Sequence, residues 1–438
     1  MRGGRVWARL MGVEKTVVDE VELVEDEEVL VAHVRPHRRE RGRCGVCRRR
    51  SPRYDGGDGR RRWRALDLGA MQAFVEADAP RVRCGEHGVV VAAVPWARHG
   101  AGHTYYFDDT VAWLATACSK TAVRQLMRVA WRTVGAIVTR VCADIDAVVD
   151  RFAGLARIGI DEISYKKNHK YLTIVVDHDS GRLVWAEPGR DAKTLAKFFD
   201  ALGEDRCAQL THVSADGAEW IARLVRQRAP QAVLCADAFH VVGWATEALD
   251  EVRRAAWNDA RRGVDSTDRT TAGGRVIKLA RGDAKKLKRA RWALWKNPED
   301  LTDKQRAKLD WIATTDPRLY RAWLLKEGLR WVFQVKGEAG KHALDRWISW
   351  ARRCRISIFV ELQRKIVKHL PTIHATLEHG LSNALIESTN TKIRVLTRVA
   401  FGFKDPHALI ALAMLALGGY QPALPADNHP RTCHKSLK

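Results

Sequence analysis

The sequence predicts a mixed α/β protein, and two observations carry this prediction. Residues 155–237 alternate between short apolar runs and helical periodicity in the order β-β-β-α-β-α-β. Long stretches with three- and four-residue apolar spacing precede and follow this region. A hairpin-rich start followed by a β-α-β unit indicates a mixed sheet and not a doubly wound parallel one.

Each element of this central region has its own local signal. The first three strands are short apolar runs, and the turn Asp179-Ser180-Gly181 joins the second and third of them into a hairpin. Two segments with helical periodicity then separate the last two strands from the hairpin and from each other. The predicted strands are residues 155–163, 171–177, 182–187, 210–216 and 232–237, and the predicted helices are residues 192–202 and 217–228.

The segments before the sheet differ sharply in charge. Residues 17–34 alternate acidic with apolar side chains, which predicts a half-buried β-hairpin, whereas residues 35–64 are strongly basic. Residues 104–152 have helical spacing and can form a helix-turn-helix with Ser119 or Lys120 in the turn. A plain helical hairpin that packs on its neighbours is the alternative for this segment.

The segments after the sheet are mainly helical. Residues 241–374 are helical, basic and rich in Trp, and residues 383–398 and 406–417 form two further predicted helices. From Pro422 onward the composition predicts an unstructured tail.

The net charge limits the class of partner. The 438 residues carry 75 Lys and Arg against 52 Asp and Glu, so the formal net charge is +23. This charge favours a polyanion, meaning nucleic acid or an anionic membrane surface. The longest apolar run is far shorter than a membrane span, and nine scattered cysteines argue against a disulfide framework. We therefore expect a cytoplasmic protein with reduced thiols that handles DNA or RNA.

Two short-spaced ligand pairs near the N-terminus predict a metal site. Cys44 and Cys47 form one pair, and Cys84 and His87 form the other. Four nitrogen and sulfur donors satisfy a tetrahedral Zn²⁺ completely, so this zinc would be structural. Gly45 and Gly85 are expected to give the two turns their backbone freedom. Basic residues nearby suit phosphate contacts, or form only a solvated charged face; they include Arg48, Arg49, Arg60 and Arg61.

Three carboxylates stand where a catalytic metal site could form. Asp161 lies on the first strand of the predicted sheet, Asp216 closes the fourth, and Glu387 lies on the helix of residues 383–398. In a mixed sheet of this type the first and fourth strands are neighbours. Grouped carboxylates repel one another, but they are ligands for Mg²⁺, or for Mn²⁺, and two such ions can drive in-line displacement at phosphorus.

These motifs together resemble the DDE transposases of the ISL3 insertion-sequence family. The resemblance rests on GIDEISYKKNHKYLTIVVD, SADGAEW, CADAFHVV and SNALIESTNTKIRVLTRVAFGF, in that order, together with the Cys/His pairs and the helical segment. It implies an RNase H-like core split by an all-helical insertion, preceded by a zinc-binding module and a helix-turn-helix. The implied divisions are residues 1–103, 104–152, 153–240, 241–374, 375–421 and a tail of residues 422–438.

By motif match, Asp161 is the first catalytic Asp, Asp216 the second, and Glu387 the catalytic Glu. Asp237 is a rival for the second position, or an auxiliary acid that acts together with His240. Glu162 is expected to point to the opposite face of its strand. Side chains around Glu387 would contact the DNA end, or in some cases only cap and solvate the helix; they are Asn383, Asn390, Lys392 and Arg394.

The resemblance implies a bacterial, nucleoid-associated enzyme that binds the terminal inverted repeats of its element. It would cleave double-stranded DNA and join the freed end to a target, at least as a homodimer when two ends are brought together. Two alternatives remain at this point, a transposase-derived DNA-binding regulator without catalysis and an RNase H-like nuclease.

Overall fold

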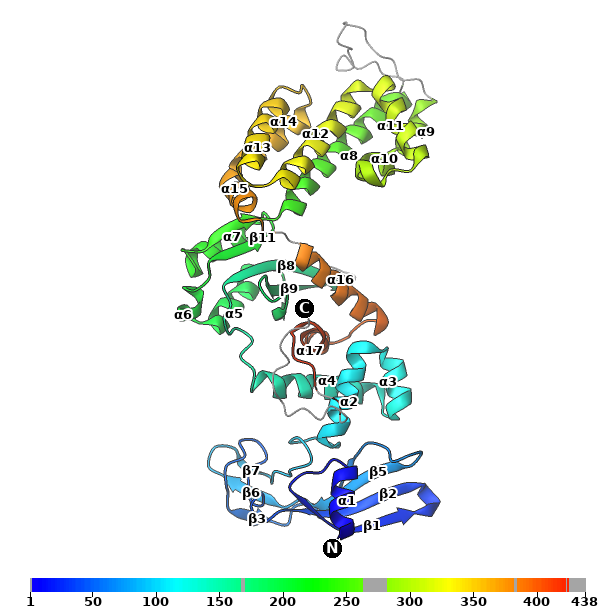
Figure 1. Cartoon of the computed structure of the whole chain (residues 1–438), viewed down its shortest axis with the longest axis vertical. Coiled ribbons are helices and arrows are strands. Elements are labelled where there is room, and N and C mark those ends of the chain that lie inside the picture. Colours follow the sequence, from blue (N-terminus) through cyan, green and yellow to red (C-terminus); the bar gives the residue numbers. More distant parts are fainter. Residues whose placement is uncertain (1, 167–169, 263–281, 382–383, 423, 425–438) are drawn as a thin grey trace. The chain divides into compact units, whose positions relative to one another are not determined.

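The computed structural model describes residues 2–166, 170–262, 282–381, 384–422 and 424 (Figure 1). The chain forms two compact units, one made of Met1–Arg151 with Ile393–Lys438 and the other of Phe152–Lys392. Apart from residues 422 and 424, the predicted tail lies outside the described residues. No helix in the described part of the chain is long and apolar enough to span a membrane.

The first unit begins with a four-stranded sheet in the order β1-β2-β5-β4. The acidic segment forms the antiparallel pair β1 (Thr16–Val24) and β2 (Val29–Pro36), which confirms the predicted hairpin. Alternate residues of β5 (Gln72–Asp78) are buried, as a sheet with one solvated face requires. The remaining elements here are α1 (Arg2–Leu10), η1 (Glu25–Glu27) and β4 (Arg60–Arg64).

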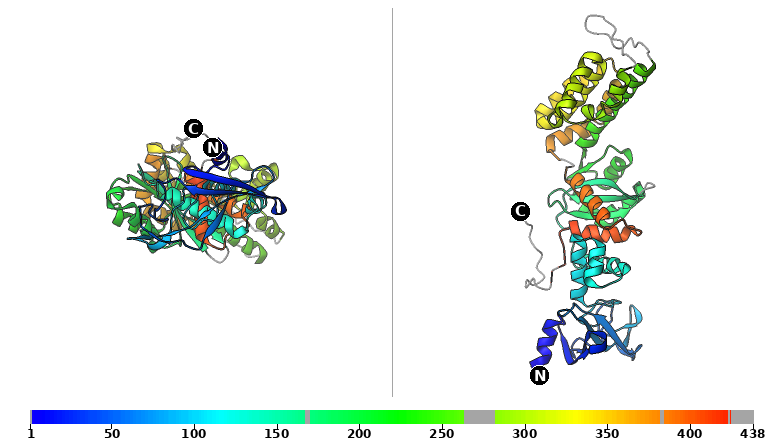
Figure 2. Two further views of the ribbon diagram at one scale, coloured as in Figure 1. Left: turned by 90° about the horizontal axis from the view of Figure 1, so that it is seen from below. Right: turned by 90° about the vertical axis from the view of Figure 1, so that its right-hand side faces the viewer.

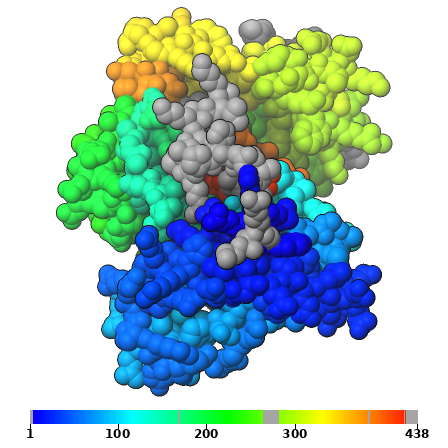
Figure 3. Space-filling view, turned by 60° about the horizontal axis from the view of Figure 1, so that its bottom comes forward, coloured from blue at the N-terminus to red at the C-terminus, as the bar shows by residue number. Residues whose placement is uncertain are grey.

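A second, three-stranded sheet in the same unit has the order β3-β6-β7. It consists of β3 (Arg53–Asp55), β6 (Arg81–Cys84) and β7 (Gly88–Val91). The tight connection between β6 and β7 carries Cys84 and His87. In the space-filling view of Figure 3 these N-terminal residues are coloured in shades of blue.

Three helices follow the sheets and confirm the helical reading of residues 104–152. They are α2 (Tyr105–Ala117), α3 (Lys120–Met127) and α4 (Trp131–Asp146). The Ser119 hydroxyl accepts a hydrogen bond from the Ala122 amide, so Ser119 caps α3 at the predicted turn. The apolar C-terminal helix α17 (Pro406–Leu417) packs against α2 and α4 and shares their core.

The second unit contains a mixed five-stranded sheet in the order β10-β9-β8-β11-β12. The central strand β8 pairs antiparallel with β9 and parallel with β11, which in turn pairs parallel with β12. The first and fourth strands are therefore neighbours, as expected. The strands are β8 (Arg157–Lys166), β9 (Lys170–Asp177), β10 (Leu183–Pro188), β11 (His212–Ala215) and β12 (Val233–Ala236).

One face of this sheet carries the apolar core. Ile158 and Ile160 of β8 and Val213 of β11 pack with Phe198 and Leu224 in this core. The helices that supply the outer layer are α5 (Ala192–Leu202) and α7 (Glu219–Arg228), and a short α6 (Glu204–Cys207) that the sequence pattern did not predict follows α5. Because strand residues alternate, Gly159 and Asp161 belong to the opposite face.

The described residues between β12 and α16 (Ala384–Val399) are mainly helical and have their own core. The long α8 (Ala238–Arg262) packs against α12 (Pro317–Val335), in the upper part of the right-hand view of Figure 2. Leu249, Leu325 and Phe359 are among its buried residues. The other elements are α9 (Asp283–Lys288), α10 (Arg291–Trp295), η3 (Pro298–Asp300), α11 (Asp303–Thr315), α13 (Gly337–Arg352), α14 (Ser357–Lys368) and α15 (Leu370–His379).

Candidate functional sites

The sheet register brings three acids to one edge. Ser214 of β11 pairs with Gly159 of β8 on one side and with Cys235 of β12 on the other. Two residues further along these parallel strands stand Asp161, Asp216 and Asp237. The three acids therefore form a row along the chain backbone, across β8 and the carboxyl ends of β11 and β12. Asp161 shares a sheet face with Gly159, whereas Asp216 and Asp237 lie just past the ends of their strands.

Asp161 is held by hydrogen bonds to both carboxylate oxygens. The backbone N–H of Glu162 donates to Oδ1 at 2.7 Å, and Nδ2 of Asn390 donates to Oδ2 at 2.6 Å. Burial raises the pKa of Asp161, and the charge of Asp237 adds to this effect. The two hydrogen bonds and the positive charge of His240 lower it.

Glu387 approaches the same row from α16 (Ala384–Val399). Its pKa is raised by burial first, then by the charges of Asp237 and Asp161, and it is lowered by His240. Glu387, Asp161 and Asp237 therefore share one electrostatic environment within the second unit. Three carboxylates without a cation would repel one another strongly at closer range.

Asp237 and His240 form a tight pair at the start of α8. Asp237 is only 3% exposed, and its Oδ1 accepts a hydrogen bond from the Phe239 amide at 2.9 Å. Its Oδ2 lies 2.5 Å from Nδ1 of His240. This hydrogen bond raises the pKa of His240 to about 9, with smaller contributions from Asp161 and Asp216. The raised pKa favours the imidazolium form of His240, and its charge in turn lowers the pKa of Asp161 and of Glu387.

The charge of Asp216 acts on Glu162, the neighbour of Asp161 on β8. Its Oδ1 accepts a hydrogen bond from the Ala218 amide at 3.0 Å. Burial and the charge of Asp216 raise the pKa of Glu162 to about 7, while Arg190 at 4.0 Å lowers it. The sequence pattern predicts that Glu162 points to the opposite face of β8 from Asp161, because neighbouring strand residues alternate between faces. The structure adds it to the acidic environment through Asp216, which follows the end of β11.

These donors suit a hard divalent cation, because they are all carboxylate oxygens. Among the described residues, however, a group of three or more ligand atoms all within 4.8 Å of one another occurs only at Cys44, Cys47, Cys84 and His87. Among the described residues, no three of these acids therefore have carboxylate oxygens all within 4.8 Å of one another.

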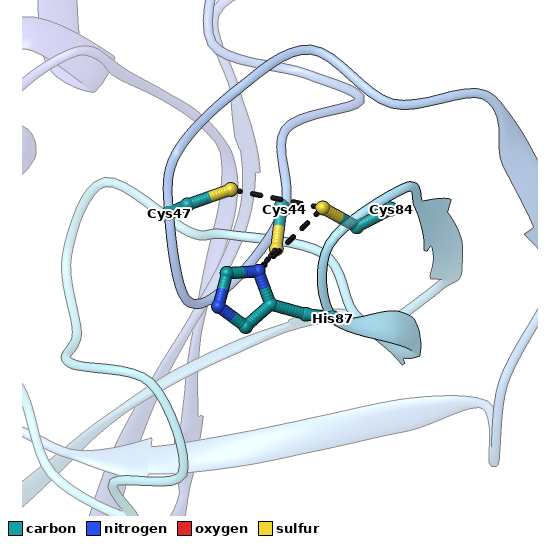
Figure 4. Close-up of side chains that lie close together, drawn as sticks. All are labelled: Cys44, Cys47, Cys84 and His87. Atoms are coloured by element: carbon teal, nitrogen blue, oxygen red, sulfur yellow. Dashed lines mark hydrogen bonds between the residues drawn. The ribbon is translucent and has the colours of Figure 1, made fainter.

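The four residues Cys44, Cys47, Cys84 and His87 form a compact cluster in the first unit (Figure 4). The Sγ atoms of Cys47 and Cys84 are 3.7 Å apart, and Nδ1 of His87 lies 3.6 Å from Sγ of Cys84 and 3.9 Å from Sγ of Cys44. Bonds of about 2.3 Å to sulfur and 2.0 Å to nitrogen give tetrahedron edges of about 3.5–3.8 Å. The cluster therefore fits one tetrahedral cation. The hydrogen bond with His87 lowers the pKa of Cys84 to about 6, which favours the thiolate form that binds metal.

Gly45 and Gly85 do not supply the unusual backbone conformation that was expected of them in the two turns. Neither Gly45 nor Gly85 has a positive φ. Gly45 is required by close approach, since a Cβ atom there would lie 2.3 Å from Nδ1 of His99, whereas a Cβ at Gly85 would meet nothing within 4 Å. The left-handed conformations belong to Arg48 and Gly88, each one residue after a ligand pair.

The arginines predicted to contact phosphate are already engaged within the first unit. Arg48 donates to the Val94 carbonyl and the Tyr105 hydroxyl, and Arg61 donates to the Ala101 carbonyl. Arg49 pairs with Glu86 at 3.1 Å and Arg60 with Glu76 at 3.0 Å. These contacts show that the four side chains support the local fold, which the pattern of charge alone did not indicate.

The residues predicted around Glu387 separate into two groups. Lys392 and Arg394 are exposed on α16. Asn390 is 5% exposed, and its side chain donates a hydrogen bond to Asp161. It is therefore bound to a candidate site acid and is not presented on the surface. Asn383 lies outside the described residues.

The order of these parts is typical of proteins that recognise and process DNA. A Cys/His cluster comes first, helices in a helix-turn-helix arrangement follow, and a mixed sheet that bears the acids comes last. Three family models match the chain in the same order. The zinc-finger of transposases IS204/IS1001/IS1096/IS1165 matches residues 40–87, the helix-turn-helix domain of transposase family ISL3 matches residues 92–142, and the ISL3 transposase domain matches residues 158–413.

Curated relatives agree with these matches. The chain is 63% identical over 442 residues to the transposase for insertion sequence element IS1557 of Mycobacterium tuberculosis strains CDC 1551 / Oshkosh and H37Rv, with 98% of this chain and 99% of the relative covered. It is 27% identical over 303 residues to the transposase for insertion sequence element IS1001 of Bordetella parapertussis, covering 67% and 70% of the two chains. The chain belongs to the ISL3 family of transposases, which confirms the resemblance seen in its motifs, and its function is transposition.

Proposed function

We propose that this transposase binds the terminal inverted repeats of an insertion sequence, cleaves the DNA by metal-dependent hydrolysis and joins the freed 3′ end to target DNA. The observation that carries the catalytic part is the shared environment of Asp161 and Glu387, which come from strand and helix segments 226 residues apart in the chain. Carboxylates brought together across such a distance repel one another, and the imidazole of His240 offsets this repulsion only in part, so a catalytic cation explains the grouping.

The sheet supports an RNase H-like core. In its order β8 is central, with an antiparallel β9 and parallel β11 and β12. Asp161 on β8 and Asp216 just after β11 agree with the positions of the first two acids that the proposed core requires. The helical region between β12 and α16 would be the insertion that separates the second acid from Glu387.

In this proposal the chain's own groups bind and orient the reacting atoms. Mg²⁺, or Mn²⁺, supplies Lewis-acid stabilisation of the attacking and leaving oxygens when bound. Hydrolysis forms a bond from a water oxygen to phosphorus and breaks the bond to the 3′ oxygen, which leaves as a 3′-hydroxyl. In strand transfer that hydroxyl attacks a target phosphate, and the displaced 3′ oxygen takes up a proton.

Two acids compete for the second position. Asp216 follows β11, the strand that pairs directly with β8, which supports it as the second catalytic Asp. The electrostatic influence of Asp237 on both Asp161 and Glu387 supports Asp237 instead. We propose Asp216 as the metal ligand and Asp237 as the auxiliary acid that keeps His240 protonated toward the substrate phosphate.

The Cys/His cluster would hold a structural zinc ion. Four protein ligands complete the tetrahedron and leave no position for substrate. We propose that the zinc module and the helix-turn-helix recognise the element ends, that Lys392 and Arg394 contact DNA phosphates beside Glu387, and that two copies of the chain act together on two ends.

The direct test is Asp161→Asn, which removes charge while keeping shape. We expect cleavage of a terminal-repeat DNA to fall at least about 1,000-fold, with repeat binding unchanged. The ion-paired surface acid Asp179 offers a control, because Asp179→Asn should cleave normally. Unchanged cleavage by Asp161→Asn would reject the proposed site. If the wild-type protein does not cleave the DNA, a DNA-binding regulator is favoured. If it cleaves the DNA without joining the ends to a target, a nuclease is favoured.

A further inference from the structure

We propose that Asn390 is a positioning residue of the catalytic centre, with its amide nitrogen fixing the carboxylate of Asp161 and its amide oxygen serving as a neutral oxygen donor beside the same cation. This inference rests on the proposed function, in which Asp161 is a metal ligand.

The orientation of the amide follows from chemistry. An ionised carboxylate accepts hydrogen bonds and donates none, so the Asn390 atom 2.6 Å from Oδ2 of Asp161 must be nitrogen. Once the nitrogen is assigned, the planar amide group limits how far the Oδ1 atom can lie from Asp161. Nitrogen and oxygen of one amide are about 2.2 Å apart, so this oxygen lies within about 5 Å of the Asp161 carboxylate.

The amide oxygen of Asn390 is a buried acceptor. Asn390 is 5% exposed, and its Oδ1 has no hydrogen-bond partner among the residues that the structure describes. A buried carbonyl oxygen without a partner loses its hydration and gains nothing in return, which is costly. A neutral oxygen next to a carboxylate is also a preferred ligand for a hard cation, so a bound cation or its coordinated water would satisfy it.

The helix places this side chain by a simple match of spacings. Ile386 lies against Gly159, and Asn390, one helical turn later, reaches Asp161, two strand residues later. One helical turn advances about 6 Å for four residues and two strand residues advance about 6.6 Å, so α16 can follow β8 over this length. Glu387 and Asn390, at i and i+3, then present their side chains on neighbouring parts of one helix face.

The variants that test this role are Asn390→Leu and Asn390→Asp. Leu keeps the approximate shape and loses both polar atoms, while Asp keeps an oxygen and loses the N–H donor. Thr389→Val is the matched control, because Thr389 is equally buried on α16 and its hydroxyl bonds only to the Leu385 carbonyl. All three proteins are compared as full-length chains.

The measurements are the Mn²⁺ dissociation constant by electron paramagnetic resonance without DNA, the cleavage rate, the affinity for repeat DNA and the thermal unfolding midpoint. We expect Asn390→Leu to lose about 10- to 100-fold in Mn²⁺ affinity and in cleavage, while DNA affinity stays within about twofold. Asn390→Asp should keep Mn²⁺ affinity, because it retains an oxygen ligand, but should lose about 10- to 100-fold in cleavage, because Asp161 loses the N–H donor that orients it. Thr389→Val should match the wild type in metal affinity and cleavage.

The outcomes separate this inference from the function on which it rests. If the wild type binds Mn²⁺ through Asp161 and cleaves, and both Asn390 variants do the same at wild-type levels, the inference is wrong and the function stands. If only DNA affinity falls, Asn390 is a DNA contact and the inference is also wrong. If the wild type neither binds Mn²⁺ nor cleaves, the proposed function itself fails. A folding defect in Asn390→Leu leaves Asn390→Asp to decide.

Discussion

Gly159 and Ile386 are in contact because Gly159 has no side chain. A Cβ atom at Gly159 would lie 2.1 Å from Cδ1 of Ile386 and 2.9 Å from Nε2 of His178. Gly159 stands two residues before Asp161 on β8, and Ile386 stands immediately before Glu387 on α16. The approach of helix to strand at this point sets the separation of the two proposed catalytic acids.

Gly159→Ala should therefore damage both stability and activity. We expect a loss of about 1–3 kcal/mol in the free energy of unfolding, since a Cβ must push α16 or rotate Ile386. Cleavage should fall further than stability predicts, because Glu387 moves with the helix. Urea denaturation and a cleavage assay on the same preparations measure the two effects.

The double variant Gly159→Ala/Ile386→Ala gives the control for this mechanism. Its loss of unfolding free energy should be smaller than the sum of the two single-variant losses by about 1 kcal/mol or more, because deleting the Ile386 side chain makes room for the new Cβ. Gly243→Ala, where a Cβ would meet nothing within 4 Å on α8, should be neutral or stabilising. Additive effects in the double variant would show that the contact does not limit the site.

Asp216→Asn and Asp237→Asn should differ in severity. If Asp216 is the metal ligand, its substitution lowers cleavage at least about 1,000-fold, whereas loss of the auxiliary Asp237 lowers it about 10- to 100-fold. Single-turnover cleavage at saturating Mg²⁺ measures both. The reverse order of severity would assign the second catalytic position to Asp237. Glu162→Gln removes the charge on which Asp216 acts, and its cleavage rate tests whether Glu162 contributes to activity.

Removal of a ligand from the Cys/His cluster should release zinc and unfold the N-terminal module. A structural zinc site contributes on the order of 10 kcal/mol to folding, so Cys44→Ser/Cys84→Ser should lose the ion and become sensitive to proteolysis within residues 40–103. Metal analysis and limited proteolysis provide the readouts. The exposed Cys118 provides the control, since Cys118→Ser should retain its zinc, and equal zinc content in all three proteins would contradict the assignment.

Glu76 should give the first unit an acid-sensitive step. The hydrogen bond from Arg62 at 2.6 Å, with Arg60 at 3.0 Å, lowers the pKa of Glu76 below its ordinary value of 4.5. A carboxyl with a lowered folded pKa stabilises the protein fully above the unfolded pKa, and this contribution is lost as pH falls through the folded value.

Glu76→Gln should therefore cost about 1 kcal/mol at neutral pH, because the partner arginines are half-exposed, and should flatten the loss of stability on acidification. Denaturation midpoints between about pH 3 and pH 7 measure this. Asp78→Asn, on the exposed end of the same strand, should keep the wild-type slope. An unchanged slope in Glu76→Gln would show that other acids set the acid limb.

Local chemistry explains why much of this protein could be predicted from its sequence. Alternating apolar residues specify the strands, three- and four-residue spacing specifies the helices, and Ser119 marks the turn of the helix-turn-helix. The clustering of Cys44, Cys47, Cys84 and His87 could be predicted as well, because each short pair is close in sequence and needs only its partner pair nearby.

The order of the elements, the two Cys/His pairs and the candidate acids follow from local sequence patterns. Which side chains face one another depends on the folded structure. Asn390 donates to Asp161, and the charge of Asp216 influences Glu162, because strand register and helix packing bring these groups near one another, and neither relationship follows from spacing along the chain. The arginines at positions 48 and 61 turn inward for the same reason: a charge pattern does not specify which carbonyl or hydroxyl will lie within reach once the sheets have formed.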